Sequence, residues 1–323
     1  PYSPAAGTGL SSHELNQPGA YREVKDTTVV AQFMVTANDV SSFLFDNDEE
    51  EVYLLAWTTT PWTLPSNTAL TVGASIDYVK INTFNKYTKK EVSVVLAEAL
   101  VSKWFTEDQF AAEYTADFEG KCIPARRVAS YSGSQLVGLR YEQLIGDSVP
   151  TDGDAFKVIS GSFVTTEDGT GIVHTAPSFG ADDRSVAEEN GIGSLTLVDG
   201  TGKMTDDAGP FAGRYVKNYT DDEAYQSLDV DIAIYLKENN RAFDVRKYAH
   251  SYPHCWRTDK PILYYPLDSW FVRVSSLRDE LVATNSQIHW KPAHTGEGRF
   301  KKWLEEVKDW NLSRSRFWGI PLP

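Results

Sequence analysis

The sequence predicts an α+β fold, and three observations point to it. Strand-like apolar runs crowd the stretch from Val29 to about Val101. Helical patterns with charged faces dominate later, at 222–241, 274–286 and 298–309. The 323 residues are 41% hydrophobic and 12% aromatic, which provides for a sizeable core and excludes a disordered chain.

The first half of the chain should consist mainly of strands. Residues 1–20 are rich in Pro, Gly, Ser and Ala and form an irregular N-terminal segment. Strands are then expected at VVAQFMV, SSFLF, VYLLAW, DYVKINTF and VSVVLAE, with the solvated, charged turn Asp46–Glu51 between the second and the third. A short amphipathic helix follows at Glu98–Thr106, and strands resume at 156–159 and 161–165.

The second half changes character. A helix should start near Ala181, and the helix at 222–241 has acids at its front and Lys/Arg late, which matches the helix dipole. After about Val245 the sequence becomes aromatic and turn-rich, and it ends in an apolar run that is unusual for a natural terminus. We therefore expect a piece of a longer protein, divided into 1–20, 21–245 and 246–323.

Charge and cysteine usage narrow the function. The chain has 45 acidic and 31 basic residues, a net charge of -14, which excludes a nonspecific nucleic-acid binder and leaves only local basic patches for such contacts. Its two cysteines, Cys122 and Cys255, fit a reducing compartment. Because there is no signal peptide and no apolar run of membrane-spanning length, the chain should be soluble and cytoplasmic, with no membrane partner.

The most informative stretch is WTTTPWTLPSN, residues 57–67. It follows an apolar strand, and the side chains of a strand alternate between its faces. Thr58, Thr59 and Thr60 therefore place hydroxyls on both faces until Pro61 ends the ladder. Threonine is common in strands, so the run on its own also fits an ordinary strand end.

A second stretch, GTGIVHTAPSFGADD, spans residues 169–183. Two glycines permit a tight turn, a strand leads to His174, and Asp182 and Asp183 open a helix. One of the two aspartates should cap that helix, stabilising it by about 1 kcal/mol, and the other should be free. On its own, His174 fits a satisfied, half-buried histidine; an acid and the threonines in the same pocket would favour a functional role.

Other chemistries find little support. The motifs GxxxxGK[ST], GxGxxG and GxSxG are absent. His250, His254 and Cys255 cluster, but Thr258 stands where a zinc site would place a second cysteine, so we expect no metal and no cofactor. Basic residues gather in three patches, each of which also fits a solvated face: Lys86, Lys89 and Lys90; Lys121, Arg126 and Arg127; and Arg299, Lys301, Lys302, Arg314 and Arg316 among Trp303, Trp310, Phe317 and Trp318.

Together, the two stretches resemble the threonine-rich motif and the GTG-VH-AP-G-DD motif of the editing domain (connective polypeptide 1) of bacterial class I isoleucyl-tRNA synthetases. HSYPHCWRTDKPILYYPLDSWFVRV and DWNLSRSRFWGIPLP resemble the segments that return to the catalytic core. Leucyl and valyl relatives tend to place an arginine after two threonines, where this chain has Thr60. The resemblance implies a closed or partly closed β-barrel with helices packed around it.

The resemblance also implies an activity, the hydrolysis of the ester in mischarged valyl-tRNA(Ile). The implied partners are the tRNA 3′ end and the rest of the synthetase. HIGH-like and KMSKS-like nucleotide-binding signatures are absent, so this chain should neither activate amino acids with ATP nor charge tRNA. Two alternatives stay open: a valyl- or leucyl-type editing domain, and a tRNA 3′-end binding module that is inactive when excised.

The family pattern implies how the pocket holds its substrate. Asp183 would anchor the α-ammonium group, which leaves Asp182 as the better candidate for the helix cap. His174 would block the extra methyl group of isoleucine. Trp57 would form a wall, and Asn67 would make a polar contact to the terminal adenosine or to the pocket backbone.

The implied chemistry is water attack on the ester. Thr58, Thr59 and Thr60 would hold the attacking water and line the pocket at low volume. An ester is already activated, so positioning the water and stabilising the oxyanion can suffice. The resemblance therefore calls for neither a covalent nucleophile nor a metal.

Overall fold

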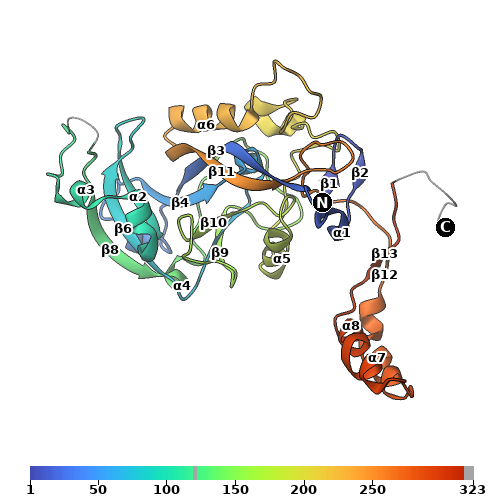
Figure 1. Cartoon of the computed structure of the whole chain (residues 1–323). Coiled ribbons are helices and arrows are strands. Elements are labelled where there is room, and N and C mark those ends of the chain that lie inside the picture. The colour runs from blue at the N-terminus through green and yellow to red at the C-terminus, as the bar shows by residue number, and fades with distance from the viewer. Residues whose placement is uncertain (119–121, 316–323) are drawn as a thin grey trace. The chain divides into compact units, whose positions relative to one another are not determined.

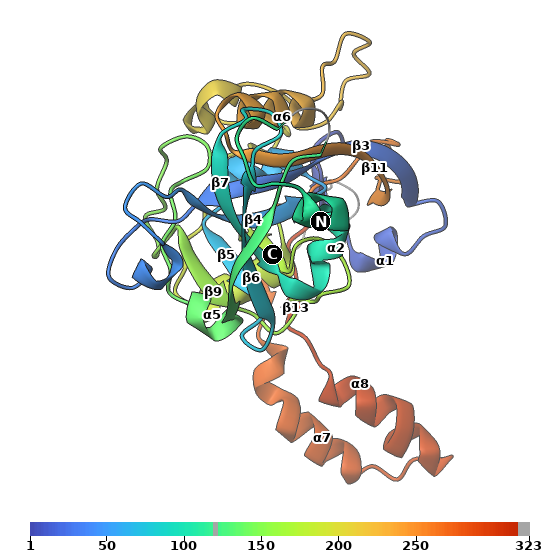
Figure 2. The same cartoon turned by 90° about the vertical axis from the view of Figure 1, so that its left-hand side faces the viewer.

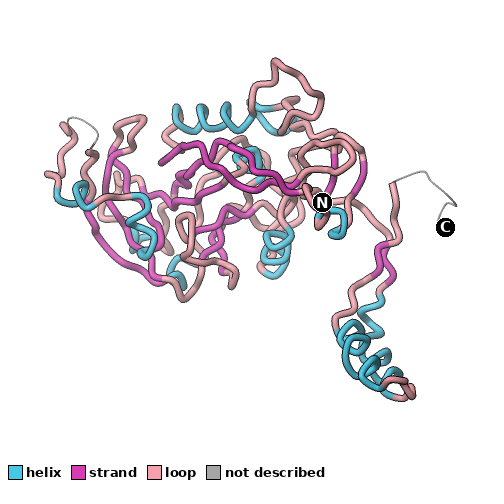
Figure 3. The backbone as a smooth tube through the Cα atoms, viewed as in Figure 1, coloured by secondary structure: helices cyan, strands magenta, loops and turns pink. Residues whose placement is uncertain are grey.

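The computed structural model describes residues 1–118 and 122–315. The chain divides into two compact units, Pro1–Tyr265 and Pro266–Pro323. The first unit contains the larger sheets, whereas the second is mainly helical with one two-stranded ladder (Figure 1, Figure 3). The division predicted from the sequence, into 1–20, 21–245 and 246–323, stays a prediction.

The first unit mixes strands with short helices, of which η denotes the 3-10 type. Its strands are β1 (Tyr2–Ser3), β2 (Thr8–Gly9), β3 (Tyr21–Met34), β4 (Val52–Thr58), β5 (Ala69–Val72), β6 (Asp77–Phe84), β7 (Glu91–Ala97), β8 (Arg126–Ser132), β9 (Lys157–Ser160), β10 (Ile172–Thr175) and β11 (Ala242–Pro253). Its helices are α1 (Ser12–Leu15), η1 (Ser42–Leu44), η2 (Pro61–Ser66), η3 (Glu98–Leu100), α2 (Val101–Trp104), α3 (Glu107–Ala111), α4 (Gly133–Leu136), α5 (Ala181–Glu189), η4 (Asp206–Phe211) and α6 (Leu228–Glu238).

The largest sheet has six strands in the order β11-β3-β4-β7-β6-β8. β3 and β11 form a long antiparallel ribbon that runs from Tyr21 opposite Pro253 to Ala31 opposite Ala242. Helix α6 lies along this ribbon, and its Ile232 and Leu236 are fully buried (Figure 1). Burial of such side chains stabilises the fold by about 1.5–3 kcal/mol each.

A smaller sheet has three strands in the order β10-β5-β9. β10 is antiparallel to β5, with His174 opposite Leu70, and β9 is parallel to β5. Figure 2 looks onto the same unit from the side of β4, β6 and β7. The small sheet brings the 169–183 stretch next to the end of β4, because β10 also contacts that strand.

The predicted closed β-barrel is not confirmed. Within residues 1–118 and 122–315, the six-stranded sheet has β11 and β8 at its edges, and no ladder joins them. Within the same sheet, β4 and β7 are paired only along Val52–Leu54. Beyond that point the amide of Ala97, at the end of β7, donates to the carbonyl of Thr170 at 2.8 Å. The fold class that stands is therefore mixed α and β in more than one sheet.

Individual elements largely follow the sequence pattern. The strands expected at VYLLAW, DYVKINTF and VSVVLAE and the helix expected near Ala181 are confirmed as β4, β6, β7 and α5. SSFLF is not a strand, because Ser41 and Asn38 bind nearby backbone groups and start the turn η1. Residues 161–165 are irregular. The long strand β11 was missed, since its aromatic residues read as a turn-rich segment.

The second unit is a small helical hairpin closed by a two-stranded ladder. It contains β12 (Phe271–Val272), η5 (Val274–Leu277), α7 (Arg278–Ser286), the π-helical turn η6 (Thr295–Phe300), α8 (Lys301–Glu305) and β13 (Trp310–Asn311). α7 and α8 pack side by side (Figure 2). Trp270, Trp303 and Trp310 are exposed. Lys121, Arg316, Phe317 and Trp318, named above in basic patches, lie outside the described residues.

Two observations concern membrane-spanning helices and metal sites. Among the described residues, no helix has the length and apolar character that crossing a membrane requires. In the same part of the chain, no group of three or more His, Cys, Asp and Glu side chains is arranged to hold a metal ion. In the cluster named above, His254 instead binds the Tyr252 carbonyl through Nδ1 at 2.9 Å, and Cys255 is a buried free thiol.

Candidate active site

A pocket of about 240 Å³ lies where the end of β4, η2, β10 and the start of α5 meet. Both sequence stretches contribute to it, although more than 100 residues separate Thr58 from His174. The lining residues are Trp57, Thr58, Thr59, Thr60, Thr63, Val173, His174, Ala176, Phe179 and Asp183. Of the residues predicted to act in a site, only Asn67 is outside this lining.

Three consecutive threonines form one wall. β4 ends at Thr58, and Pro61 begins η2, so the backbone turns between them as the sequence predicted. The Thr58 hydroxyl accepts a hydrogen bond from the Thr60 amide at 3.1 Å and lies 3.4 Å from the Thr60 hydroxyl. Thr58 is buried, while Thr59 and Thr60 are half-buried and face the pocket. The wall thus presents small hydroxyl groups to the cavity.

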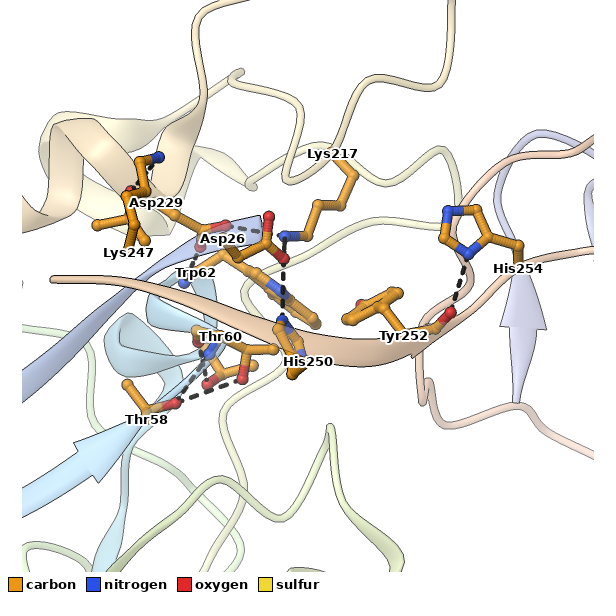
Figure 4. A network of polar contacts seen from close by, with 12 residues as sticks. Asp26, Thr58, Thr60, Trp62, Lys217, Asp229, Lys247, His250, Tyr252 and His254 are labelled. Atoms are coloured by element: carbon orange, nitrogen blue, oxygen red, sulfur yellow. Dashed lines mark hydrogen bonds and ion pairs between the residues drawn. The ribbon is translucent and has the colours of Figure 1, made fainter. Parts of the chain in front are cut away.

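Helix α6 fixes the position of η2 behind this wall. The Trp62 amide, in the first turn of η2, donates to Asp229 Oδ1 at 3.0 Å. The second oxygen of Asp229 pairs with Lys217 at 2.9 Å, and Lys217 also pairs with Asp26 at 3.0 Å. Figure 4 shows this network, with His250 Nε2 3.3 Å from Asp26.

One ammonium in this network faces two carboxylates. Asp229 is only 1% exposed, and burial raises its pKa while Lys217 opposes that effect. Burial alone would lower the pKa of Lys217, but Asp229 and Asp26 raise it above its ordinary value, which keeps the ammonium charged. The same ammonium lies 5.2 Å from the centre of the Tyr252 ring. Such a satisfied charge pair gives η2 one defined anchor point.

His174 forms the opposite wall and is only 8% exposed. Its Nδ1 lies 2.8 Å from Asn67 Nδ2, and its Nε2 lies 3.0 Å from the Thr63 hydroxyl. Burial lowers the pKa of His174 from 6.5 to about 3, so the ring is neutral at physiological pH. Because both ring nitrogens bind protein groups, the imidazole is held as a fixed surface.

Asn67 supports the pocket from behind rather than lining it. The residue is buried, and its side-chain amide donates to the carbonyl of Ala69 at 2.8 Å as well as to His174. The carbonyl of Thr175 lies 3.4 Å from the same nitrogen. Of the two contacts predicted for Asn67, the structure therefore contains the one to backbone groups beside the pocket.

Asp183 is the acid of the pocket. Its Oδ2 accepts a hydrogen bond from the Ala176 amide at 2.9 Å, which turns the carboxylate toward β10. Burial raises the pKa of Asp183 from 3.8 to about 6, the Ala176 bond opposes the shift, and Asp182 adds to it. Above pH 6 the group is thus a half-buried carboxylate without a cationic partner among its hydrogen bonds.

The expectation that an aspartate side chain caps α5 is wrong. The cap residue is Gly180, and no side-chain hydrogen bond caps the helix. Asp182 is exposed, and both aspartates lie in the first turn, where the helix dipole favours acids. Asp183 turns back toward Gly180, where a Cβ atom would lie 2.8 Å from its Cγ, so the glycine leaves room for the carboxylate.

Aromatic rings complete the walls. Trp57 packs edge to face against Tyr248, with ring centres 5.3 Å apart, and against the Gly169 turn, where φ is +72°. Phe179 is buried and packs edge to face on Trp62 at 5.1 Å. Phe179, Thr63, Val173 and Ala176 were not predicted to line the site. Their place inside the two motifs, within three residues of a predicted site residue or of the Ala-Pro turn, was the available signal.

The pocket offers polar groups but no activated nucleophile of the serine-protease type. Thr63 and His174 are 3.0 Å apart, as in a hydroxyl–base pair, yet the Thr63 hydroxyl donates to the Thr60 carbonyl at 2.8 Å. A histidine with a pKa of about 3 is also too weak a base to activate that hydroxyl. The arrangement suits binding a small cationic group at Asp183 and a water molecule at the threonines.

Comparisons with known proteins show to which family the sequence is related. A family model described as tRNA synthetases class I (I, L, M and V) matches residues 1–323. The isoleucine–tRNA ligase of Cytophaga hutchinsonii is 54% identical over 100% of this chain and 30% of that protein. The isoleucine–tRNA ligase of Porphyromonas gingivalis is 51% identical over 100% of this chain and 31% of that protein.

One solved structure has a weaker likeness. It is the P. knowlesi cytosolic leucyl-tRNA synthetase editing domain, which is 14% identical with a TM-score of 0.47. The match covers 70% of this chain and 97% of that one. The sequence comparisons therefore decide the family. The chain spans about 30% of the length of the curated relatives that it matches.

Proposed function

This chain belongs to the class I tRNA synthetases of the isoleucyl, leucyl, methionyl and valyl group, and from that premise we propose that it is an editing domain that hydrolyses the ester of valyl-tRNA(Ile). The observation that carries the proposal is the pocket in which Thr58, Thr59 and Thr60 face His174 and Asp183. The chain is 54% identical in sequence to an isoleucine–tRNA ligase, which favours isoleucyl specificity.

The physical need for a second site is clear. A binding site that accepts isoleucine cannot strongly reject valine, because one missing methylene changes the binding energy too little, a limit for which isoleucyl-tRNA synthetases are themselves the standard example. A smaller pocket can destroy the valyl ester and exclude the larger isoleucyl ester. A cavity of about 240 Å³ bounded by a fixed imidazole supports such a size limit.

Asp183 anchors the substrate in this proposal. The carboxylate of Asp183 pairs with the α-ammonium group of the aminoacyl ester. This ammonium is the positive partner that Asp183 lacks among its own hydrogen bonds. Desolvation of the carboxylate strengthens this charge-assisted bond. His174 then meets the side chain of the amino acid and blocks the additional methyl group of isoleucine.

The threonines act on the water. Thr58, Thr59 and Thr60 hold it against the ester carbonyl, and their hydroxyls can donate to the oxyanion as it forms. Trp57 forms the aromatic wall beside them. Since the ester is already reactive, positioning the two reactants accounts for the catalysis without a covalent intermediate, a metal or a cofactor.

The remaining parts of the proposal concern the longer protein. The chain would receive the tRNA 3′ end from the synthetic core of the synthetase in the cytoplasm, with 21–245 as the editing domain and 1–20 and 246–323 as its connections. The finer fold assignment, a partly closed barrel, is supported by hydrogen bonds that link the large sheet to the segment just before β10. Thr170 donates through its hydroxyl to the Leu55 carbonyl at 2.6 Å, beside the Ala97–Thr170 bond.

The test compares two esters. The isolated chain is mixed with valyl-tRNA(Ile) and with isoleucyl-tRNA(Ile), and ester loss is followed against buffer. We expect rapid loss of the valyl ester only. In the His174→Ala variant the isoleucyl ester should also be attacked, because the wall that excludes it is gone. Continued rejection of isoleucyl-tRNA by that variant would move discrimination to another residue.

The same experiment separates the alternatives. Ester loss no faster than in buffer, with tRNA still bound, would favour a 3′-end binding module that is inactive when excised. Loss of both esters at equal rates in the unmodified chain would contradict the size limit. Hydrolysis of a valyl- or leucyl-type substrate instead, such as threonyl-tRNA(Val), would place the chain in a different editing branch.

A further inference from the structure

A line of buried hydrogen bonds runs from Tyr141 to the pocket wall. The Tyr141 hydroxyl donates to Asn67 Oδ1 at 2.7 Å, and Asn67 Nδ2 lies 2.8 Å from His174 Nδ1. On the far side of the ring, His174 Nε2 contacts the Thr63 hydroxyl at 3.0 Å. Only the last two members of this line touch the cavity.

The chemistry of the partners fixes the direction of every bond in the line. The carbonyl of Ala69 can only accept, so the Asn67 atom 2.8 Å from it must be the amide nitrogen. The same nitrogen therefore donates to His174 Nδ1, which must be unprotonated. A neutral imidazole then carries its proton on Nε2 and donates it to Thr63, whose own proton goes to the Thr60 carbonyl.

The surroundings of Tyr141 keep its hydroxyl in place at the end of this line that is most distant from the cavity. It is 3% exposed and packs edge to face against Phe33 and Phe156, with ring centres 5.4 Å and 6.2 Å away. Burial raises its pKa well above the ordinary value, so its hydroxyl stays a donor over the whole working pH range. The Asn67 oxygen has no other hydrogen-bond donor among the contacts of the described residues.

We propose that Tyr141 is a positioning residue for the size limit of the pocket. Its hydroxyl holds the Asn67 amide in one orientation, and the amide holds His174 in the Nε2–H tautomer with its ring in one plane. The inference rests on the proposed editing function for its consequence, but not for its structural claim. Without the hydroxyl, Asn67 can turn, the imidazole gains freedom, and the pocket admits a larger side chain.

The structural claim is tested by NMR of the imidazole nitrogens in the whole chain. The nitrogen shifts and their couplings to the ring protons report which nitrogen carries the proton. The His174 signals, assigned by comparison with the His174→Ala variant, should show the Nε2–H tautomer alone. The opposite tautomer in the unmodified chain would overturn the proposal whatever any variant does.

The functional claim uses Tyr141→Phe, which removes the oxygen and keeps both ring contacts. The variant should show a mixture of His174 tautomers, and its rate of isoleucyl-tRNA(Ile) hydrolysis relative to valyl-tRNA(Ile) should rise about tenfold, the effect expected of one lost buried hydrogen bond. The matched control is Tyr53→Phe. Tyr53 is also buried, at 4% exposed, and its hydroxyl donates to Glu51, away from the pocket lining.

The outcomes separate the two proposals. If the unmodified chain hydrolyses neither ester, the proposed function fails, while the tautomer spectra still decide the positioning claim. If Tyr141→Phe folds and leaves the His174 spectrum unchanged, Tyr141 does not position the ring. If the spectrum changes in an active chain but the ratio of the two rates does not, the size limit does not depend on this line. An equal change in Tyr53→Phe would also overturn the proposal.

Discussion

At the scale of single residues, the surroundings of His174 decide between two roles that its chemistry allows. An imidazole can act as a base or as a rigid surface. Here its two nitrogens bind Asn67 and Thr63, and burial lowers its pKa to about 3. A base of that strength with no free nitrogen cannot take a proton from water near pH 7. The residue therefore acts through its shape.

Asp183 is a carboxylate whose burial in the folded chain makes its ionised form less favourable. Burial raises its pKa from 3.8 to about 6, so the native state binds a proton more tightly than the unfolded state does. Between about pH 4 and about pH 6 the native state holds more protons, and stability falls as the pH rises through that window. The penalty stays above pH 6, where an ammonium ligand would relieve it.

We predict that Asp183→Asn removes this pH dependence. Asparagine keeps an oxygen for the Ala176 amide but cannot ionise, so the variant should be more stable than the unmodified chain at pH 8. Urea unfolding at pH 4, 6 and 8 measures the slope. Deacylation of valyl-tRNA(Ile) should be lost by about 100-fold or more, because the charged anchor is gone.

The neighbouring Asp182 provides the control for that prediction. It is exposed, lies in the same helical turn and does not line the pocket. Asp182→Asn should keep deacylation and most of the pH dependence of stability, because burial is the larger cause of the raised Asp183 pKa and Asp182 only adds to it. An Asp183→Asn variant that retains full activity would remove the anchor role, and an unchanged slope would contradict the raised pKa.

At the scale of elements, the pocket depends on how η2 is held. A 3-10 helix of six residues has little stability by itself, and its first turn needs partners for its amides. Asp229 in α6 supplies one of them by accepting from the Trp62 amide at 3.0 Å. The same acid pairs with Lys217 at 2.9 Å, and Lys217 also pairs with Asp26 at 3.0 Å. The threonine wall is thus connected to α6 and to β3.

We predict that Asp229→Ala destabilises the first unit by about 3–5 kcal/mol, because it leaves the buried Lys217 ammonium with one partner fewer and the Trp62 amide with none. Urea unfolding measures the loss. The double variant Asp229→Leu with Lys217→Met should recover part of it, since the buried ammonium is then removed together with its buried acid, while the half-buried Asp26 keeps its contact with His250.

An exposed pair serves as the control for the buried one. Arg184 and Glu188 form an i,i+4 pair at 2.8 Å on α5, with side chains 54% and 63% exposed. Glu188→Ala should change stability by less than about 0.5 kcal/mol. A loss of stability of similar size in Asp229→Ala and Glu188→Ala would mean that the contact of Asp229 with η2 contributes no more than an exposed ion pair does.

At the scale of the whole molecule, all the pocket residues lie in the first compact unit. The ten lining residues, the Tyr141 line and the Lys217 network fall within Pro1–Tyr265. The second unit, Pro266–Pro323, has its own small ladder, with Phe271 opposite Asn311 and Val272 opposite Trp310.

We predict that a chain ending at Tyr265 folds alone. It should unfold in one cooperative transition, and its pocket-bearing unit should keep the midpoint that it has in the full chain, because its main hydrophobic core lies within residues 1–265. Tryptophan fluorescence and circular dichroism in urea should give coincident curves. A free energy of unfolding lower than that of the same unit in the full chain by more than about 1 kcal/mol would show that the second unit stabilises the first.

Much of the site could be predicted from the sequence because its chemistry is concentrated in two short stretches. A threonine run stopped by Pro61 and a histidine followed by an Ala-Pro turn both have local causes, namely strand alternation and the backbone limits of proline and glycine. The predictions that failed had non-local causes. SSFLF is not a strand, because the Ser41 side chain binds a nearby backbone carbonyl. The strand β11 forms because β3 pairs with it from one end to the other.

The sequence by itself, through the resemblance of its two motifs to a known family, indicated that residues 57–60, His174 and Asp183 belong to one pocket. Only the tertiary structure decided what several of them do. Asn67 turned out to hold His174, Gly180 rather than an aspartate caps α5, and Tyr141 and Asp229 support the walls from positions distant in the chain. The physical reason is that burial and hydrogen-bond pairing join groups from distant parts of the chain, and these pairings set protonation, tautomer and orientation.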